Sequence, residues 1–64
     1  MTPELQKMIE DAHKEELADI NKYIKMSDIA KDNGNDCVYG ILKDIIHDEK
    51  SHAKILEYIL ETEV

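Results

Sequence analysis

The sequence predicts an all-α protein: an antiparallel two-helix hairpin that forms a homodimer and thereby a four-helix bundle. Two stretches with helical periodicity, about residues 3–32 and 36–61, flank the only strong helix-breaking segment, residues 33–35. Hydrophobic residues make up 42% of the 64-residue chain, more than two helices can bury against each other. We therefore expect one helical domain over residues 1–64, whose surplus apolar surface predicts association with other copies, as a dimer or a higher assembly of dimers, or with a partner.

The first helix is expected to begin after Thr2, which can act as N-cap before Pro3 and Glu4 in the first turn. Apolar residues then recur at alternating steps of four and three, the rhythm of a helix that faces the centre of a bundle. A carboxylate, Glu16, interrupts this row near the middle of the helix. The main row is Leu5, Ile9, Ala12, Glu16, Asp19, Tyr23, Met26 and Ala30, and the row that widens it is Leu17, Ile20 and Ile24.

Gly34 can adopt the left-handed conformation that ends the first helix, and Asn35 or Asp36 can cap the second. In the second helix, Glu49 and His52 interrupt the apolar row three residues apart. Burying a carboxylate at such a position is costly unless it has a partner. The main row is Val38, Leu42, Ile45, Glu49, His52, Leu56 and Ile59, and a second row of Tyr39, Ile46, Ala53 and Leu60 widens it.

An antiparallel hairpin that turns at Gly34 places Glu16 opposite position 52 and Glu49 opposite position 19. Glu16, Glu49 and His52 are therefore expected at one level of the bundle. A Glu-x-x-His pair on one helical face can bind a metal with both side chains pointing inward. A two-fold dimer would bring together four carboxylates and two imidazoles, a set for two divalent ions. Such mixed ligands suit iron, manganese or zinc better than magnesium or calcium.

These residues resemble a known group of proteins. The stretch from Glu16 to Tyr23 has the Glu-x6-Tyr pattern of the ferritin-like di-iron carboxylate superfamily, and residues 48–53, Asp-Glu-Lys-Ser-His-Ala, are similar to rubrerythrins. A chain with a single hairpin resembles the encapsulated ferritins, which build a di-iron site between two chains. The resemblance implies that Glu16, Glu49 and His52 ligate two irons per dimer, and that the Tyr23 hydroxyl steadies a ligand carboxylate. It also implies oxidation of Fe(II) by dioxygen or peroxide, a ferroxidase-type activity.

Three further residues are candidates for a part in this site. Glu15 is an acidic neighbour of the ligand Glu16, as in encapsulated ferritins, and could attract metal. Asp19 shares the apolar row and is a candidate extra ligand. His13 lies one turn before Glu16 and is either a surplus ligand or a histidine on the flank of the helix.

Charge and cysteine usage limit the partners and the location. The formal net charge is −7 and all eight basic residues are lysines, so nucleic acid is not expected as a partner. No apolar run is long enough to span a membrane, and no signal-peptide pattern is present. One cysteine, Cys37, fits a reducing cytoplasm. Residues 62–64 do not resemble an encapsulin-docking peptide, so encapsulation is not expected.

Two other interpretations remain open. The chain could be a non-catalytic helical hairpin that acts through protein association, with its carboxylates satisfied by Lys50, Lys54 or water. The metal could instead be structural, as zinc is in many small domains, although structural zinc prefers closed tetrahedral sites of cysteine and histidine. A Glu49→Gln variant would discriminate between a metal site and a non-catalytic hairpin. In a hairpin without a metal role, the substitution should leave assembly intact or strengthen it, with no dependence on metal.

Overall fold

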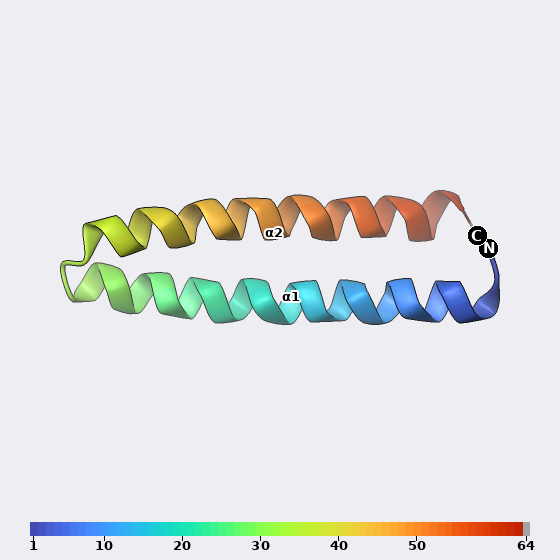
Figure 1. The fold of residues 1–64 in the computed structure, drawn as a ribbon, viewed down its shortest axis with the longest axis horizontal. Coiled ribbons are helices and arrows are strands. Elements are labelled where there is room, and N and C mark those ends of the chain that lie inside the picture. Colours follow the sequence, from blue (N-terminus) through green and yellow to red (C-terminus); the bar gives the residue numbers. More distant parts are fainter. Residues whose placement is uncertain (64) are drawn as a thin grey trace.

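The computed structural model describes residues 1–63 and contains two long helices, α1 (Pro3–Asp32) and α2 (Asp36–Thr62). They run antiparallel and pack against each other along their whole length, with both termini at one end and the turn at the other (Figure 1). The expected all-helical hairpin is confirmed. Its dimensions of 48 × 14 × 11 Å show that the molecule is only one layer of helices thick.

Local sequence explains where α1 begins and ends. The Thr2 hydroxyl accepts a hydrogen bond from the Leu5 backbone N–H at 3.2 Å, which satisfies one of the free donors of the first turn. At the other end Gly34 takes a φ of 70°. This conformation lets the Gly34 N–H donate to the Lys31 carbonyl at 3.1 Å and the Asn35 N–H donate to Ala30 at 2.8 Å, a Schellman motif.

The start of α2 differs from the expectation in one detail. Asn35 occupies the N-cap position, but its side chain makes no capping hydrogen bond because its backbone follows directly from the tight turn, with ψ at 72°. The Asn35 carbonyl still accepts the first helical hydrogen bond, from the Tyr39 N–H at 2.9 Å. Asp36 in the first turn places a negative charge at the positive end of the helix dipole, which stabilises this end in place of the cap.

The contact between the helices combines residues of the expected main rows with residues of the rows that widen them, and adds Ser27. The most deeply buried residues are Ile20, Ser27, Ala30, Leu42, Ile46 and Ala53. Of the expected main rows, Met26 and Val38 are instead 43% and 41% exposed. Helix α2 is therefore rotated so that its widening row, rather than half of its main row, faces α1, whereas in the widening row of α1 only Ile20 is buried. Ser27 allows this close approach because it is small, and its buried hydroxyl donates to the Ile24 carbonyl at 2.8 Å.

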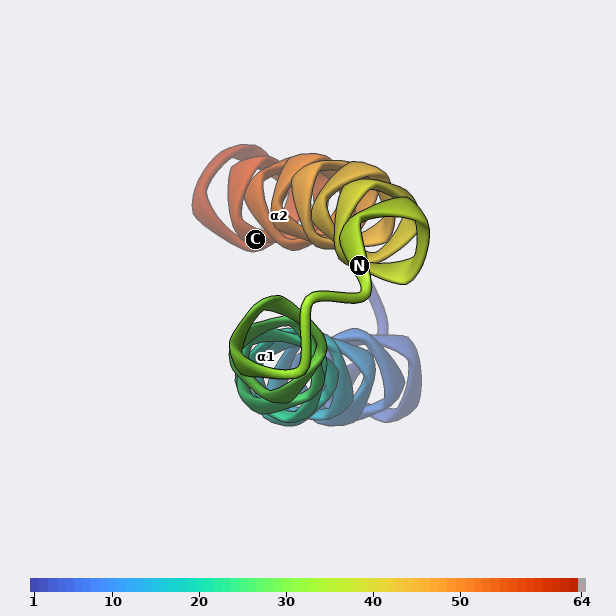
Figure 2. The same cartoon turned by 90° about the vertical axis from the view of Figure 1, so that its left-hand side faces the viewer.

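This rotation leaves the hairpin with two open faces, one on each side of the plane shared by the helices (Figure 2). The helical repeat assigns residues to these two faces. In each helix, the residue three positions after one that touches the other helix lies on one face, and the residue one position after it lies on the opposite face. The first, which we call the site face, contains Leu5, Ala12, Asp19, Met26, Val38, Ile45, His52 and Ile59. The second, which we call the groove face, contains Leu17, Ile24, Lys43, Lys50, Lys54 and Glu57.

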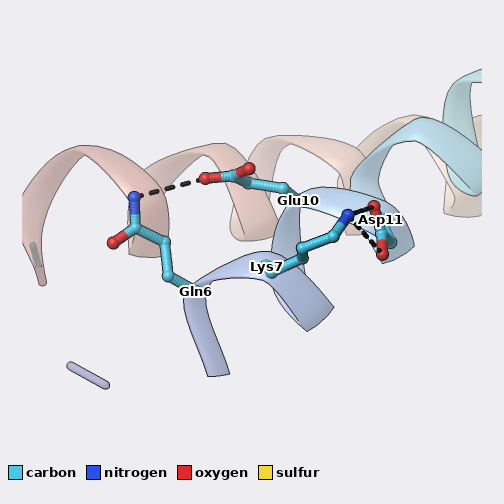
Figure 3. Close-up of polar contacts among 4 residues, drawn as sticks. All are labelled: Gln6, Lys7, Glu10 and Asp11. Atoms are coloured by element: carbon cyan, nitrogen blue, oxygen red, sulfur yellow. Dashed lines mark hydrogen bonds and ion pairs between the residues drawn. The ribbon is translucent and has the colours of Figure 1, made fainter. Parts of the chain in front are cut away.

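The N-terminal part of α1 carries two polar side-chain pairs (Figure 3). The Gln6 amide donates to Glu10 at 3.2 Å, and the Lys7 ammonium lies 3.3 Å from both Asp11 oxygens. Pairs four residues apart on an exposed helix contribute about 0.3–0.5 kcal/mol each, so they support helix α1 without fixing the fold. Neither helix of the described chain has an apolar stretch long enough to cross a lipid bilayer.

Candidate metal centre

The structure brings Glu16 from α1 together with Glu49 and His52 from α2. One ligand atom of each residue lies within 4.8 Å of the other two. The His52 Nδ1 is 3.7 Å from Glu49 Oε1 and 4.0 Å from Glu16 Oε2. Ligand atoms on opposite sides of one metal ion are about 4.2 Å apart when the metal–ligand bonds are about 2.1 Å long. Small side-chain movements would therefore bring all three residues onto one ion.

The two carboxylates are much less exposed than the imidazole. The side chain of Glu49 is 19% exposed and that of Glu16 is 24% exposed, whereas His52 is 56% exposed on the site face. The Glu16 Oε2 is buried and has no hydrogen-bond partner among residues 1–63. A buried carboxylate oxygen without a partner is costly, and a bound cation would satisfy it. The donor set therefore fits a divalent metal ion.

Proximity of the two carboxylates changes the acidity of the site. The pKa of the Glu49 carboxyl is raised above its ordinary value of 4.5, first because a protonated Glu49 can donate a hydrogen bond to Glu16. Burial and the negative charges of Glu16 and Asp19 raise this pKa further, while His52 lowers it. The site thus holds more negative charge than its own surroundings neutralise, which is the electrostatic condition for binding a cation.

Asp19 and Tyr23 follow Glu16 on α1 by one and two helical turns. Tyr23 is half-buried, two turns after Glu16 on the same side of the helix, and its hydroxyl makes no hydrogen bond within residues 1–63. Asp19 is also half-buried, and its charge acts on Glu49. Neither residue belongs to the three-residue ligand group. Asp19 therefore acts on the group through its charge, whereas no hydrogen bond among residues 1–63 joins Tyr23 to it.

His13 and Glu15 have other surroundings. The Nε2 of His13 is 3.0 Å from Glu57 Oε1, a contact that joins the two helices one turn away from the ligand group. Glu15 is exposed on the outer side of α1. Glu57 is not among the candidates that the sequence suggests. The antiparallel register that pairs Glu16 with position 52 could have indicated it, because this register also brings His13 level with the residues just before Glu57.

An antiparallel helical hairpin with a glutamate on one helix and a Glu-x-x-His pair at the same level on the other defines a ferritin-like unit. A sequence model of one family, Rubrerythrin, matches residues 7–63. The chain therefore belongs to the rubrerythrin family, within the ferritin-like di-iron superfamily, and the resemblance to rubrerythrins is confirmed. Rubrerythrin-type domains bind iron. No curated protein and no solved structure gives a significant match to the chain.

Proposed function

We propose that this protein binds two iron ions at a site completed by two copies of the chain, and that dioxygen or peroxide oxidises the bound iron. The observation that carries the proposal is the convergence of Glu16, Glu49 and His52, with one carboxylate oxygen buried and unpartnered. Family membership supports iron as the metal. Manganese and zinc are the other ions that this set of oxygen and nitrogen ligands accepts.

The number of ligands supports a site shared between chains. One chain offers two carboxylates and one imidazole, which is too few to fill the coordination shell of an iron ion and to hold a second ion. Two chains related by a two-fold axis offer four carboxylates and two imidazoles. The four negative charges balance two divalent ions, so every buried carboxylate gains a partner.

The position of the ligands along the hairpin supports the same arrangement. Glu49 is the central residue of the 27-residue helix α2, and Glu16 lies close to the middle of the 30-residue helix α1. A two-fold axis that lies in the plane between two facing site faces and runs perpendicular to the helices brings the two ligand groups opposite each other, with the hairpins fully overlapped, only when the groups lie near the middle of the hairpin. In this dimer the turn of one hairpin lies over the chain termini of the other.

The site face has the apolar surface that such a dimer needs. Large hydrophobic side chains remain exposed on it in the single hairpin, among them Leu5, Met26 and Val38. The face is apolar at both ends and carries its ionisable groups, Asp19 and His52, in the middle. Packing two such faces buries the apolar ends and encloses the ligands in one layer of the resulting four-helix bundle.

Each residue then has a defined task. Glu16 and Glu49 hold the ions and favour the ferric state through their negative charge. His52 gives each ion a neutral nitrogen ligand, and the Tyr23 hydroxyl is available to donate a hydrogen bond to a ligand carboxylate. When bound, two Fe(II) ions supply two electrons, which with two protons reduce one hydrogen peroxide to two waters.

The metal content of the protein tests this proposal. We would load the chain with Fe(II) without oxygen, desalt it, and measure iron per chain beside Glu49→Ala and the matched control Glu61→Ala, an exposed glutamate near the end of α2. We expect about one iron per chain in the wild type and the control, and almost none in Glu49→Ala. Peroxide should then convert the bound iron to the ferric form. A wild type that retains no metal would instead indicate a non-catalytic hairpin.

A further inference from the structure

The groove face carries a depression that the proposed metal site and dimer do not use. It has a volume of about 300 Å³ and is lined by Leu17, Ile20, Lys50, Ala53, Lys54 and Glu57. Ile20 and Ala53 are buried and form its floor, while Leu17 is 43% exposed at its edge. The depression is hollow because Ala53 is the smallest apolar residue on the α2 side of the contact. Pairing two hairpins through their site faces leaves it open to solvent.

The charges around this depression are unlike those of the rest of the chain. The formal net charge is −7, yet two lysines line the depression and Lys43, one heptad before Lys50, continues the basic strip along α2. Neither Lys50 nor Lys54 forms an ion pair within residues 1–63. The one acidic residue that lines it, Glu57, is held by His13 at 3.0 Å. Two lysines against one carboxylate leave an excess of formal positive charge at the rim.

The apolar part of the surface is also extended along the helices. Ile24 is 36% exposed and follows Leu17 by one heptad, so the two side chains continue the apolar strip on α1 beside the basic strip on α2. A helix lying between α1 and α2 on this face would meet apolar side chains on one side and lysines on the other. An amphipathic helix whose apolar face is bordered by carboxylates is complementary to both strips.

From this arrangement we propose that the groove face is a docking surface for an acidic amphipathic helix of a partner protein. The apolar residues of that helix pack on Leu17, Ile20 and Ile24, and its carboxylates pair with Lys50 and Lys54. This proposal does not depend on the metal site, because the two faces lie on opposite sides of the hairpin.

A designed peptide tests it. The probe is a fluorescently labelled helical peptide of about five turns, with leucines repeating at the spacing of one helical face and glutamates on both sides of them. Binding to the full chain is followed by fluorescence anisotropy. We expect saturable binding that weakens with added salt, and a Lys50→Glu/Lys54→Glu double variant that binds at least about tenfold more weakly.

The matched control is Lys22→Glu/Lys25→Glu, which makes the same change in net charge at exposed positions of α1 outside the depression. Its affinity should stay within about twofold of the wild type. Circular dichroism checks that both variants keep their helices. The proposal is overturned if both pairs of substitutions weaken binding equally, if a peptide with lysines in place of glutamates binds as well, or if the acidic peptide does not bind. It is also overturned if the chain's own copies occupy this face, seen as self-association that Leu17→Lys abolishes.

Discussion

Glu49 is the residue whose ionisation reports on the site before any metal is bound. Its pKa is raised, so the folded protein holds the Glu49 proton more tightly than the unfolded chain. This group therefore contributes stability below its ordinary pKa of 4.5, and the contribution is lost as the pH rises through the raised value. Urea unfolding of metal-free wild type and Glu49→Gln across this range should show the wild type losing more stability with rising pH. Parallel profiles would contradict the coupling of Glu49 to Glu16.

The same substitution has the opposite consequence once metal is present. Glu49→Gln keeps the shape of the side chain but removes a negatively charged ligand. Metal at about a hundred times its dissociation constant stabilises a protein by about 2.7 kcal/mol, which raises the Tm of a domain this small by about 10 °C or more. We expect anaerobic Fe(II) to raise the Tm of the wild type and of Glu61→Gln in this way. A comparable rise in Glu49→Gln would count against Glu49 as a ligand.

The convergence of the candidate ligands was predictable from single residues. Carboxylates on apolar rows mark positions that need a partner, and the antiparallel turn at Gly34 fixes which residues share a level. The His13–Glu57 contact was not predictable in the same way, because both residues look like ordinary solvent-exposed groups in the sequence. Their pairing depends on the rotation of both helices, which residue types alone do not determine.

At the scale of elements, two glycines test the turn between the helices. Gly34 lies in the turn, and Gly40 inside α2 is its matched control. Gly34 has a φ of 70°, and Gly40 lies inside α2 with open space where a Cβ would be. Gly34→Ala should destabilise the protein by about 1–2 kcal/mol, because a side chain disfavours the left-handed conformation. Gly40→Ala should stabilise it by up to about 1 kcal/mol through helix propensity. Denaturant unfolding of both variants measures the two effects, and equal signs would contradict this account of the turn.

The rotation of each helix is the part of the fold that the sequence left ambiguous. Both helices have apolar faces wide enough to offer two alternative rows, and the expected rows combined residues from two different contacts. Ile46 and Ala53 pack inside the hairpin, whereas Val38 and Met26 remain exposed on the site face. A wide apolar face predicts that a helix has two neighbours, but not which row faces which neighbour.

At the scale of the whole molecule, the hairpin exposes more surface than a protein of its size should. A compact monomer of 7.4 kDa exposes about 4,200 Å². The hairpin exposes 4863 Å², and its smallest dimension is only 11 Å. An elongated single layer of helices has no room for a central core, and the proposed association through the site face would supply one.

Two substitutions at equally exposed positions distinguish the faces of the molecule. Met26 on the site face and Leu17 on the groove face are both 43% exposed. Met26→Lys would bury an unpaired charge in the proposed dimer and should raise its dissociation constant by roughly a hundredfold. Leu17→Lys should leave the dimer intact. Sedimentation velocity over a range of concentrations measures the dissociation constant of each variant. A dimer that survives Met26→Lys but not Leu17→Lys would show that the chains meet through the groove face instead.

In the proposed dimer, two chains complete one site for two irons. Native mass spectrometry of the anaerobically Fe(II)-loaded protein tests it most directly, because it reports chains and metal ions in the same particle. We expect a dominant species of two chains with two irons, and loss of both the metal and most of the dimer in Glu49→Ala. A single chain that carries its own iron, or a wild-type dimer that binds none, would contradict it.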